Sequence, residues 1–149
     1  MNKTAVYFVG IGGIGMSGLA QYFLAQGHAV AGYDRILTPL TEKLVALGAT
    51  VTDSDDVTII PTIFTNPAHT KVIYTPAIPA DSPLLNFFRT GGFALQKRAE
   101  VIGEISATMP CLAIAGTHGK TTTTSLLTHL LRASGKKITA FLGGIAENI

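Results

Sequence analysis

The chain has 149 residues, of which 47% are hydrophobic and 13% charged, so it can bury one core of ordinary size and begin a second. The 11 Lys and Arg residues outnumber the 9 Asp and Glu residues only slightly, and they are scattered along the chain. The sequence therefore has no cluster of basic residues that could bind nucleic acid or an anionic membrane, and we expect neither as a partner.

The N-terminal segment carries Lys3 and a long apolar stretch that could be taken for a signal peptide or a membrane anchor. Five glycines between Gly10 and Gly18, with polar residues after them, argue against both, and we expect a cytoplasmic location. The single cysteine, Cys111, lies in an apolar run and is predicted to be a small buried strand residue.

The first half of the chain predicts parallel strands joined by helices. Residues 5–9 form an apolar run of strand length, residues 16–26 have helical spacing, and residues 29–33 form a second strand that ends at Asp34. This strand-helix-strand unit has the length expected of a right-handed crossover between two parallel strands. A helix over residues 39–47 follows, with a proline in its first turn.

A third strand is expected over residues 49–51. The next stretch, residues 52–71, is polar and broken by prolines, with at most a short helix around residues 57–64, and we predict no function for it. A strand over residues 72–75 stops at prolines. Asp81 and Ser82 cap a helix that runs through Arg89.

A strand over residues 93–96 and a helix over residues 98–107 complete the alternation, which predicts an α/β fold with a Rossmann-like, doubly wound parallel sheet. From Pro110 the pattern starts again, with a strand over residues 110–115, a glycine loop, a helix over residues 120–133 and a strand over residues 138–142. We expect a second α/β domain that begins here and is not finished.

The first glycine loop reads Gly10-Ile-Gly-Gly-Ile-Gly15 and lies between a predicted strand and a predicted helix. Such glycines let the backbone approach a diphosphate, whose charge the helix N-terminus stabilises. Asp34, at the end of the next strand, suits a hydrogen bond to a ribose or a base. The pattern predicts a nucleotide but does not say which, because NAD, NADP and UDP-sugars all offer a diphosphate and a ribose.

The second glycine loop, Gly116-Thr-His-Gly-Lys-Thr-Thr122, follows a predicted strand and opens a helix, as in the phosphate loops of nucleoside triphosphatases. Its backbone N–H groups would surround the phosphates of a nucleoside triphosphate, Lys120 would bind the β/γ oxygens, and Thr121 would ligate Mg²⁺. Ile114 occupies the usual position of the first glycine, so the loop is a shortened form. His118 either contacts phosphate or is an exposed loop residue.

Four segments of the chain, taken in their order along the sequence, resemble motifs of the cytoplasmic Mur ligases of bacterial peptidoglycan synthesis. They begin at Gly10, Tyr74, Lys97 and Ala115, and a Phe-Leu-Gly-Gly segment ending at Gly144 follows them. The resemblance implies a UDP-sugar-binding Rossmann-like domain over residues 1–108. It also implies that residues 109–149 are the beginning of a P-loop ATP-binding domain, with one strand-loop-helix-strand unit.

The resemblance also implies the ligands. UDP-N-acetylmuramate would be held by the residues that match the family's motifs, and Arg98 would reach it from the domain boundary. These residues are Gly12, Gly13, Ile14, Gly15, Asp34, Thr75, Pro76, Ala77 and Arg98. The ATP site would comprise Gly116, Thr117, His118, Gly119, Lys120, Thr121 and Thr122. The family usually has a serine pair where this chain has Thr75 and Pro76, which removes one hydroxyl and one backbone donor.

The activity that the resemblance implies is ATP-dependent amide formation. The γ-phosphate of ATP would convert the muramate carboxylate to an acyl phosphate, which the amine of L-alanine would attack. Lys120 and Mg²⁺ would offset charge on the transferred group, with Thr121 or Thr122 holding the metal. Because family ligases also need the rest of the ATP domain and a C-terminal domain, residues 1–149 should bind the UDP-sugar without turning it over.

Three other functions remain open from the sequence. A nicotinamide-dependent oxidoreductase explains the first loop but leaves Lys120 and Thr121 without a role. A recycling ligase that attaches a whole tripeptide to the same sugar would use similar loops. A nucleotide-sensing module would bind both ligands and show no activity. The oligomeric state is not predicted.

Overall fold

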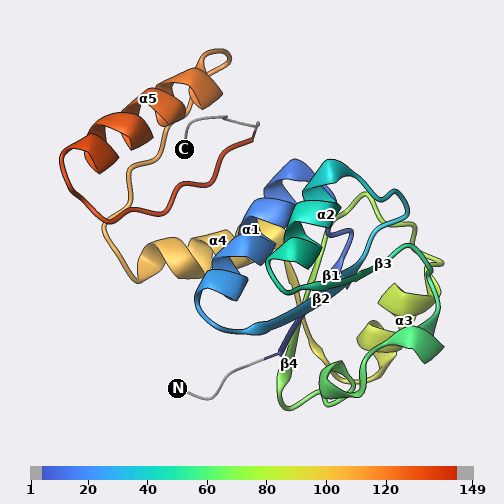
Figure 1. Cartoon of the computed structure of the whole chain (residues 1–149). Helices are drawn as coiled ribbons and strands as arrows, with labels where there is room; N and C mark the ends of the chain where they lie inside the picture. Colours follow the sequence, from blue (N-terminus) through green and yellow to red (C-terminus); the bar gives the residue numbers. More distant parts are fainter. Residues whose placement is uncertain (1–4, 144–149) are drawn as a thin grey trace.

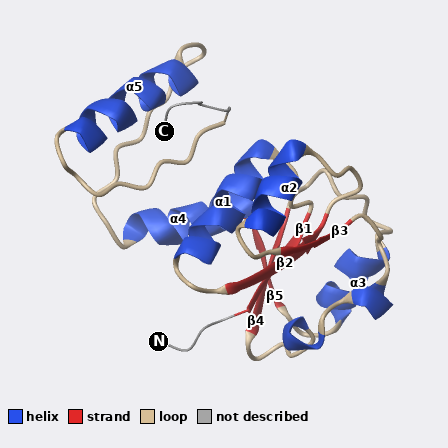
Figure 2. Ribbon diagram, in the orientation of Figure 1, coloured by secondary structure: helices blue, strands red, loops and turns tan. Residues whose placement is uncertain are grey.

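The computed structural model describes residues 5–143 and contains a single sheet of parallel strands (Figures 1 and 2). The strands are β1 (Ala5–Val9), β2 (Ala29–Tyr33), β3 (Thr50–Thr52), β4 (Thr70–Tyr74) and β5 (Ala94–Lys97). Their order across the sheet is β3-β2-β1-β4-β5, so the chain moves outward from β1 in one direction and then returns to build the other half. The predicted doubly wound parallel sheet is confirmed.

Helices connect the strands. They are α1 (Ile14–Ala25), α2 (Pro39–Ala46), α3 (Pro83–Thr90), α4 (Arg98–Ala107) and α5 (Lys120–Ala133). The predicted bounds of α4 and α5 are confirmed residue for residue. In the proline-broken stretch, two short 3₁₀ turns, η1 (Val57–Ile59) and η2 (Thr62–Phe64), replace the single short helix that was expected.

Helices cover both faces of the sheet, which Figure 2 shows with α1 and α4 on one side and α3 on the other. Along β1, Tyr7 and Val9 join a core cluster with Phe88, whereas Val6 and Phe8 join a second cluster with Leu19. Because successive strand residues point to opposite faces, an uninterrupted apolar strand is what a sheet buried on both sides requires.

Strand register brings the carboxyl ends of three strands to one level. Val9 of β1 pairs with Tyr33 of β2 on one side and with Tyr74 of β4 on the other. The segments that follow these residues therefore leave the sheet at the same edge. This edge, next to the reversal of strand order at β1, is where α/β sheets bind ligands.

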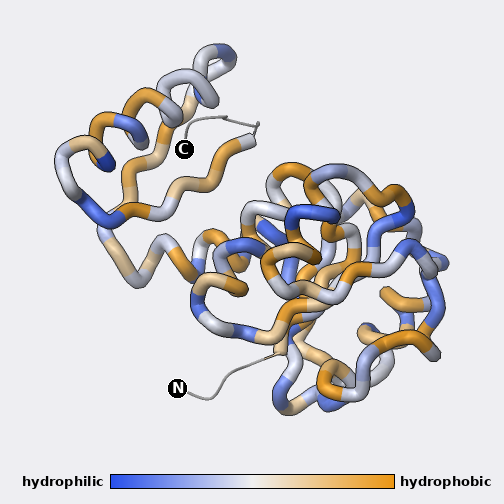
Figure 3. The backbone as a smooth tube through the Cα atoms, in the orientation of Figure 1, coloured by the Kyte–Doolittle hydropathy of each residue, from blue (hydrophilic) through white to orange (hydrophobic). Residues whose placement is uncertain are grey.

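The segments on either side of α5 differ from the prediction. Residues 110–115 and 138–142 are largely hydrophobic in Figure 3, but neither forms a strand. A strand needs a hydrogen-bonded neighbour, and no strand within residues 5–143 pairs with either segment. The prediction that Cys111 is buried was wrong for the same reason, because the cysteine is exposed where no sheet covers it.

The second unit exposes several large apolar side chains. Leu112, Leu126 and Leu130 are between 61% and 68% exposed. Phe141 is half-buried and packs against Tyr22 of α1, with ring centroids 5.8 Å apart. Gly144, the last residue of the Phe-Leu-Gly-Gly segment, lies outside the described residues.

Across residues 5–143, no helix combines the length and the apolar character needed to span a membrane.

Candidate functional site

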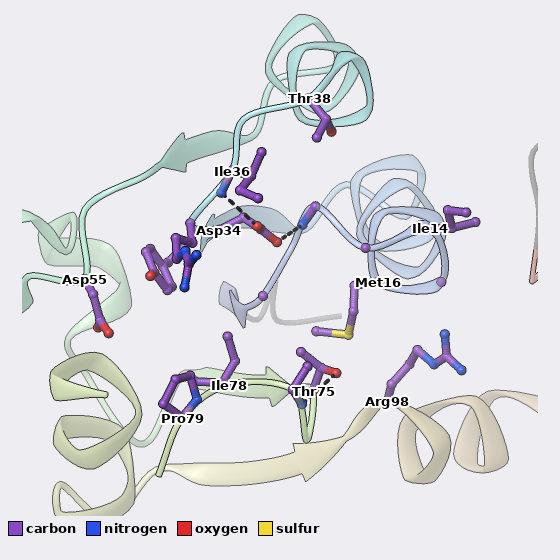
Figure 4. A pocket seen from close by; sticks show the side chains of 17 residues that line it. Ile14, Met16, Asp34, Ile36, Thr38, Asp55, Thr75, Ile78, Pro79 and Arg98 are labelled. Carbon is purple, nitrogen blue, oxygen red and sulfur yellow. Dashed lines mark hydrogen bonds between the residues drawn. The ribbon is translucent and has the colours of Figure 1, made fainter. Parts of the chain in front are cut away.

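A cleft of about 580 Å³ opens at the carboxyl edge of the sheet (Figure 4). Its walls come from the glycine loop and the start of α1, the segment after β2, the turn after β4, and the first residue of α4. The predicted UDP-sugar residues are separated by up to 86 positions in the sequence, between Gly12 and Arg98, and all of them except Pro76 line this one cleft.

The glycine loop is tied to β2 and delivers the N-terminus of α1 to the cleft. The N–H groups of Gly10 and Ile11 both donate to the carbonyl oxygen of Tyr33, at 2.8 and 2.9 Å. Gly13 is the N-cap of α1, makes no side-chain cap hydrogen bond, and is followed by a first turn without acidic residues. The first N–H groups of the helix have no partner within it, and they favour an anion.

Asp34 lies at the rim of the cleft, but its carboxylate is directed at backbone. Oδ2 accepts a hydrogen bond from the Gly12 N–H at 2.6 Å, and Oδ1 accepts one from the Ile36 N–H at 3.2 Å, as the dashed lines in Figure 4 show. A Cβ atom on Gly12 would lie 2.9 Å from this carboxylate, so the loop and the aspartate are in close contact. Both carboxylate oxygens therefore have a protein partner.

Arg98 reaches the glycine loop from α4. A Cβ atom built on Gly15 would lie 1.6 Å from Nη1 of Arg98, so the guanidinium rests directly against the backbone of Gly15. The one ion pair within residues 5–143 joins Lys71 to Glu104, and Arg98 therefore has no carboxylate partner there. A cation beside a helix N-terminus is electrostatically unfavourable unless an anion joins them, which matches the site predicted for a diphosphate.

The wall opposite the glycine loop is the turn after β4. Thr75 and Ala77 line the cleft as predicted, together with Ile78 and Pro79. The N–H of Ile78 donates to the carbonyl oxygen of Thr75 at 3.2 Å and closes the turn. Pro76 is exposed and does not line the cleft, because this turn carries it away from the opening.

Several lining residues were not predicted from the sequence. They are Met16, Tyr33, Arg35, Ile36, Thr38 and Asp55, besides Ile78 and Pro79. Asp55 comes from the stretch for which no function was predicted, and it accepts hydrogen bonds from the Ser82 hydroxyl and the Leu84 N–H, both at 3.0 Å. Its position just after β3 was the available signal, since all these strands end at the same edge.

Two tyrosines near the cleft stay neutral at ordinary pH. Burial, reinforced by the negative charge of Asp55, raises the pKa of Tyr7 to about 12. The pKa of Tyr33 is also raised, first by burial and then by Asp55 and Asp34. Tyr33 lines the cleft, and its phenol is neutral there.

The second glycine loop surrounds the N-terminus of α5. Gly119, the N-cap, has φ +77°, and the first turn of the helix has no acidic residue. The Lys120 ammonium bends back to the carbonyl oxygens of Gly116 at 2.5 Å and Thr117 at 3.2 Å. The predicted ATP residues, from Gly116 to Thr122, are all exposed. A cation and open helix N–H groups side by side fit the phosphates of a nucleotide.

Residues 5–143 contain no group of three or more His, Cys, Asp or Glu side chains that could hold a metal ion. The Thr121 hydroxyl, in the first turn of α5, is exposed and free to bind an ion that a nucleotide brings with it. These residues fit a phosphate-bound Mg²⁺ better than a metal bound by protein side chains alone.

Fold and cleft together define a Rossmann-like α/β protein with a glycine loop at the carboxyl edge of its sheet. The model of the Mur ligase family, catalytic domain, matches residues 5–109. The chain belongs to the Mur ligase family.

The chain is similar to curated ligases over almost all its length. It is 54% identical to UDP-N-acetylmuramate–L-alanine ligase of Christiangramia forsetii, over 96% of this chain and 32% of that protein. It is 52% identical to the ligase of the same name from Parabacteroides distasonis, over 99% of this chain and 32% of that protein. The chain thus spans about a third of the length of these relatives.

Two solved structures share the fold. The UDP-N-acetylmuramate-alanine ligase of Thermotoga maritima superimposes with a TM-score of 0.86 at 31% identity, covering 98% of this chain and 33% of that one. The UDP-N-acetylmuramate:L-alanyl-gamma-D-glutamyl-meso-diaminopimelate ligase of Neisseria meningitides gives 0.85 at 26% identity, covering 98% and 44%. The fold alone therefore does not separate these two activities.

Proposed function

We propose that the chain is the front part of a bacterial, cytoplasmic ATP-dependent ligase that joins L-alanine to the carboxylate of UDP-N-acetylmuramate in peptidoglycan precursor synthesis. The observation that carries this proposal is the open N-terminus of α1 in the cleft, with the unpaired Arg98 guanidinium beside it. Relatives that are 46% to 54% identical support it, because all of them are named UDP-N-acetylmuramate–L-alanine ligase.

In this proposal, residues 1–108 bind the UDP-sugar. The backbone from Gly12 to Gly15 holds the diphosphate, and Arg98 neutralises part of its charge. Asp34 lies on the uridine side of the loop, and the turn containing Thr75, Pro76 and Ala77 forms the opposite wall.

Residues 109–149 are the beginning of the ATP-binding domain. The loop from Gly116 to Thr122 surrounds the triphosphate, and Lys120 exchanges its two carbonyl partners for β/γ oxygens. Thr121 holds Mg²⁺, which neutralises phosphate charge when bound and whose other ligands come from outside these residues. Lys120 stabilises charge as the phosphoryl group passes to the muramate carboxylate, which forms the acyl phosphate that L-alanine attacks. Residues 1–149 alone bind the sugar nucleotide without completing the reaction.

Two alternatives are less well supported. The recycling ligase has the same fold, but its solved relative is 26% identical, against 31% for the solved L-alanine ligase. A curated L-alanine ligase is 54% identical to this chain. Acceptor tests with L-alanine and the tripeptide, in a protein extended beyond Ile149, separate the two. An oxidoreductase leaves the loop around Lys120 without a role.

Calorimetry with a pair of reciprocal variants tests the two sites. Arg98→Ala should weaken binding of UDP-N-acetylmuramate roughly tenfold or more and leave ATP binding unchanged, because a charged hydrogen-bond donor is lost from one site only. Lys120→Ala should weaken ATP binding and leave binding of UDP-N-acetylmuramate unchanged. NADH should not stabilise the protein against heat.

Equal loss of both ligands in either variant would mean that the two sites are misassigned. Stabilisation by NADH alone would favour the oxidoreductase. Phosphate release by residues 1–149 supplied with ATP, Mg²⁺, L-alanine and UDP-N-acetylmuramate would contradict the proposal that this part of the protein does not turn over.

A further inference from the structure

We propose that residues 140–143 form a strap that docks the second unit, residues 109–143, against α1 and α4, and that the strap docks more firmly when the cleft holds a diphosphate. The inference goes beyond the proposed function, but it rests on it in taking the cleft to be the site of a diphosphate.

The second unit is joined to the first domain at two places. One is the chain itself, which leaves α4 at Ala107. The other is the strap, which returns toward α1 after α5 (Figure 1) and packs the ring of Phe141 against Tyr22, with centroids 5.8 Å apart and an angle of 59° between the planes. Tyr22 in turn contacts the buried Phe23. The strap therefore fixes the orientation of a unit that a single covalent link would leave free to swing.

The docking contact is small and apolar. Ala140, Phe141 and Leu142 are half-buried. Among residues 5–143, no hydrogen bond or ion pair joins the strap to α1 or α4. A single aromatic pair shifts an equilibrium by only roughly two- to tenfold. The docked and released forms of the strap therefore differ little in free energy, and a ligand with different affinities for them can shift their populations.

The strap and the cleft share a wall. A cavity of about 120 Å³ lies between the strap and the first domain, where its lining residues are Gly15, Gly18, Arg98 and Ile102. Gly15 and Arg98 also line the large cleft. The Arg98 guanidinium rests on the backbone of Gly15, where the two cavities meet. A diphosphate at the N-terminus of α1 would hold the guanidinium there and so fix the wall against which the strap docks.

Thermodynamic linkage makes this coupling reciprocal. If a diphosphate favours the docked strap, the docked strap must favour the diphosphate by the same factor. Removal of the Phe141 ring should then weaken binding of a diphosphate, although Phe141 does not line the large cleft. A contact that only stabilised the fold would change the thermal midpoint and leave the affinity of the folded protein unchanged.

The first measurement is fluorescence. The chain contains no tryptophan, so Phe141→Trp places a single reporter in the strap. Leu130→Trp is the matched control, at a residue of α5 that is 65% exposed. Saturating UDP should lower the acrylamide quenching constant of Phe141→Trp about twofold or more and leave that of Leu130→Trp unchanged. If the indole of Phe141→Trp is as accessible as the control before UDP is added, Tyr22→Trp reports from the other side of the contact.

The second measurement is calorimetry with UDP. Phe141→Ala should weaken binding by roughly two- to tenfold, whereas Leu130→Ala should leave it unchanged. The inference is overturned if Phe141→Ala binds UDP as the wild type does, or if saturating UDP leaves quenching in the strap unchanged or increases it. Failure of the wild-type chain to bind UDP would instead contradict the proposed function.

Discussion

At the scale of single residues, the glycines of the first loop serve the cleft in two different ways. Gly10 has φ +94°, and a Cβ atom there would lie 2.5 Å from Cγ2 of Thr75, on the opposite wall. Gly13, in the same loop, has φ −65° and open space around the position of a Cβ atom. The two glycines are therefore present for different reasons, one for backbone conformation and contact, the other for access to the helix N-terminus.

Gly10→Ala should lower the free energy of unfolding by about 1–3 kcal/mol, because a left-handed backbone is strained for alanine. Gly13→Ala, the control, should change it by less than about 0.5 kcal/mol, since the gain from a stiffer unfolded chain offsets a poorer N-cap. Urea denaturation measures both. Similar losses in the two variants would mean that the loop is constrained in some other way.

At the scale of elements, α3 is fixed by a cap that joins distant parts of the chain. The Ser82 hydroxyl accepts a hydrogen bond from the Leu85 N–H at 3.2 Å and donates to Asp55 at 3.0 Å. The cap is buried, and Ser82 is 2% exposed. Because Asp55 also lines the cleft, this cap ties one wall of the site to the helix that covers the far face of the sheet.

Ser82→Ala should destabilise the protein by about 1–2 kcal/mol, since it removes an N-cap and leaves the buried Leu85 N–H without its partner. Ser54→Ala, at an exposed serine two residues after β3, is the matched control and should be close to neutral. Denaturation midpoints compare the two, and a neutral Ser82→Ala would show that water replaces the hydroxyl at no cost.

At the scale of the whole molecule, the core is complete before the second unit begins. All members of both buried clusters lie between Ala5 and Val101. Among the partly buried hydrophobic residues that pack against them, Phe141 alone comes from the described chain beyond residue 108. The second unit adds little burial to the first and lacks a sheet of its own among residues 5–143.

Residues 1–108 should therefore fold without the remainder. We expect a cooperative thermal transition within about 5 °C of the full chain, because loss of the half-buried Phe141 contact removes less than about 1 kcal/mol. Residues 1–92, which lack Phe93 and Val101 of the core, should show no cooperative transition. If residues 1–108 also lack one, the domain boundary after residue 108 is misplaced.

The sequence by itself determined the alternation of strands and helices, because apolar runs, prolines, glycines and the Ser82 cap are local signals. It also identified both glycine loops and, by their combination, the family. It could not show that Asp34 uses both carboxylate oxygens on backbone, that Arg98 rests on Gly15, or that Asp55 enters the cleft, since these depend on which strand ends share an edge.

The two segments beside α5 also separate what the sequence determines from what tertiary structure decides. Their apolar runs predict strands, and Cys111 was expected to be buried in one of them. A strand, however, is stabilised by hydrogen bonds to its neighbours and a side chain is buried only by what covers it, so tertiary structure decided both.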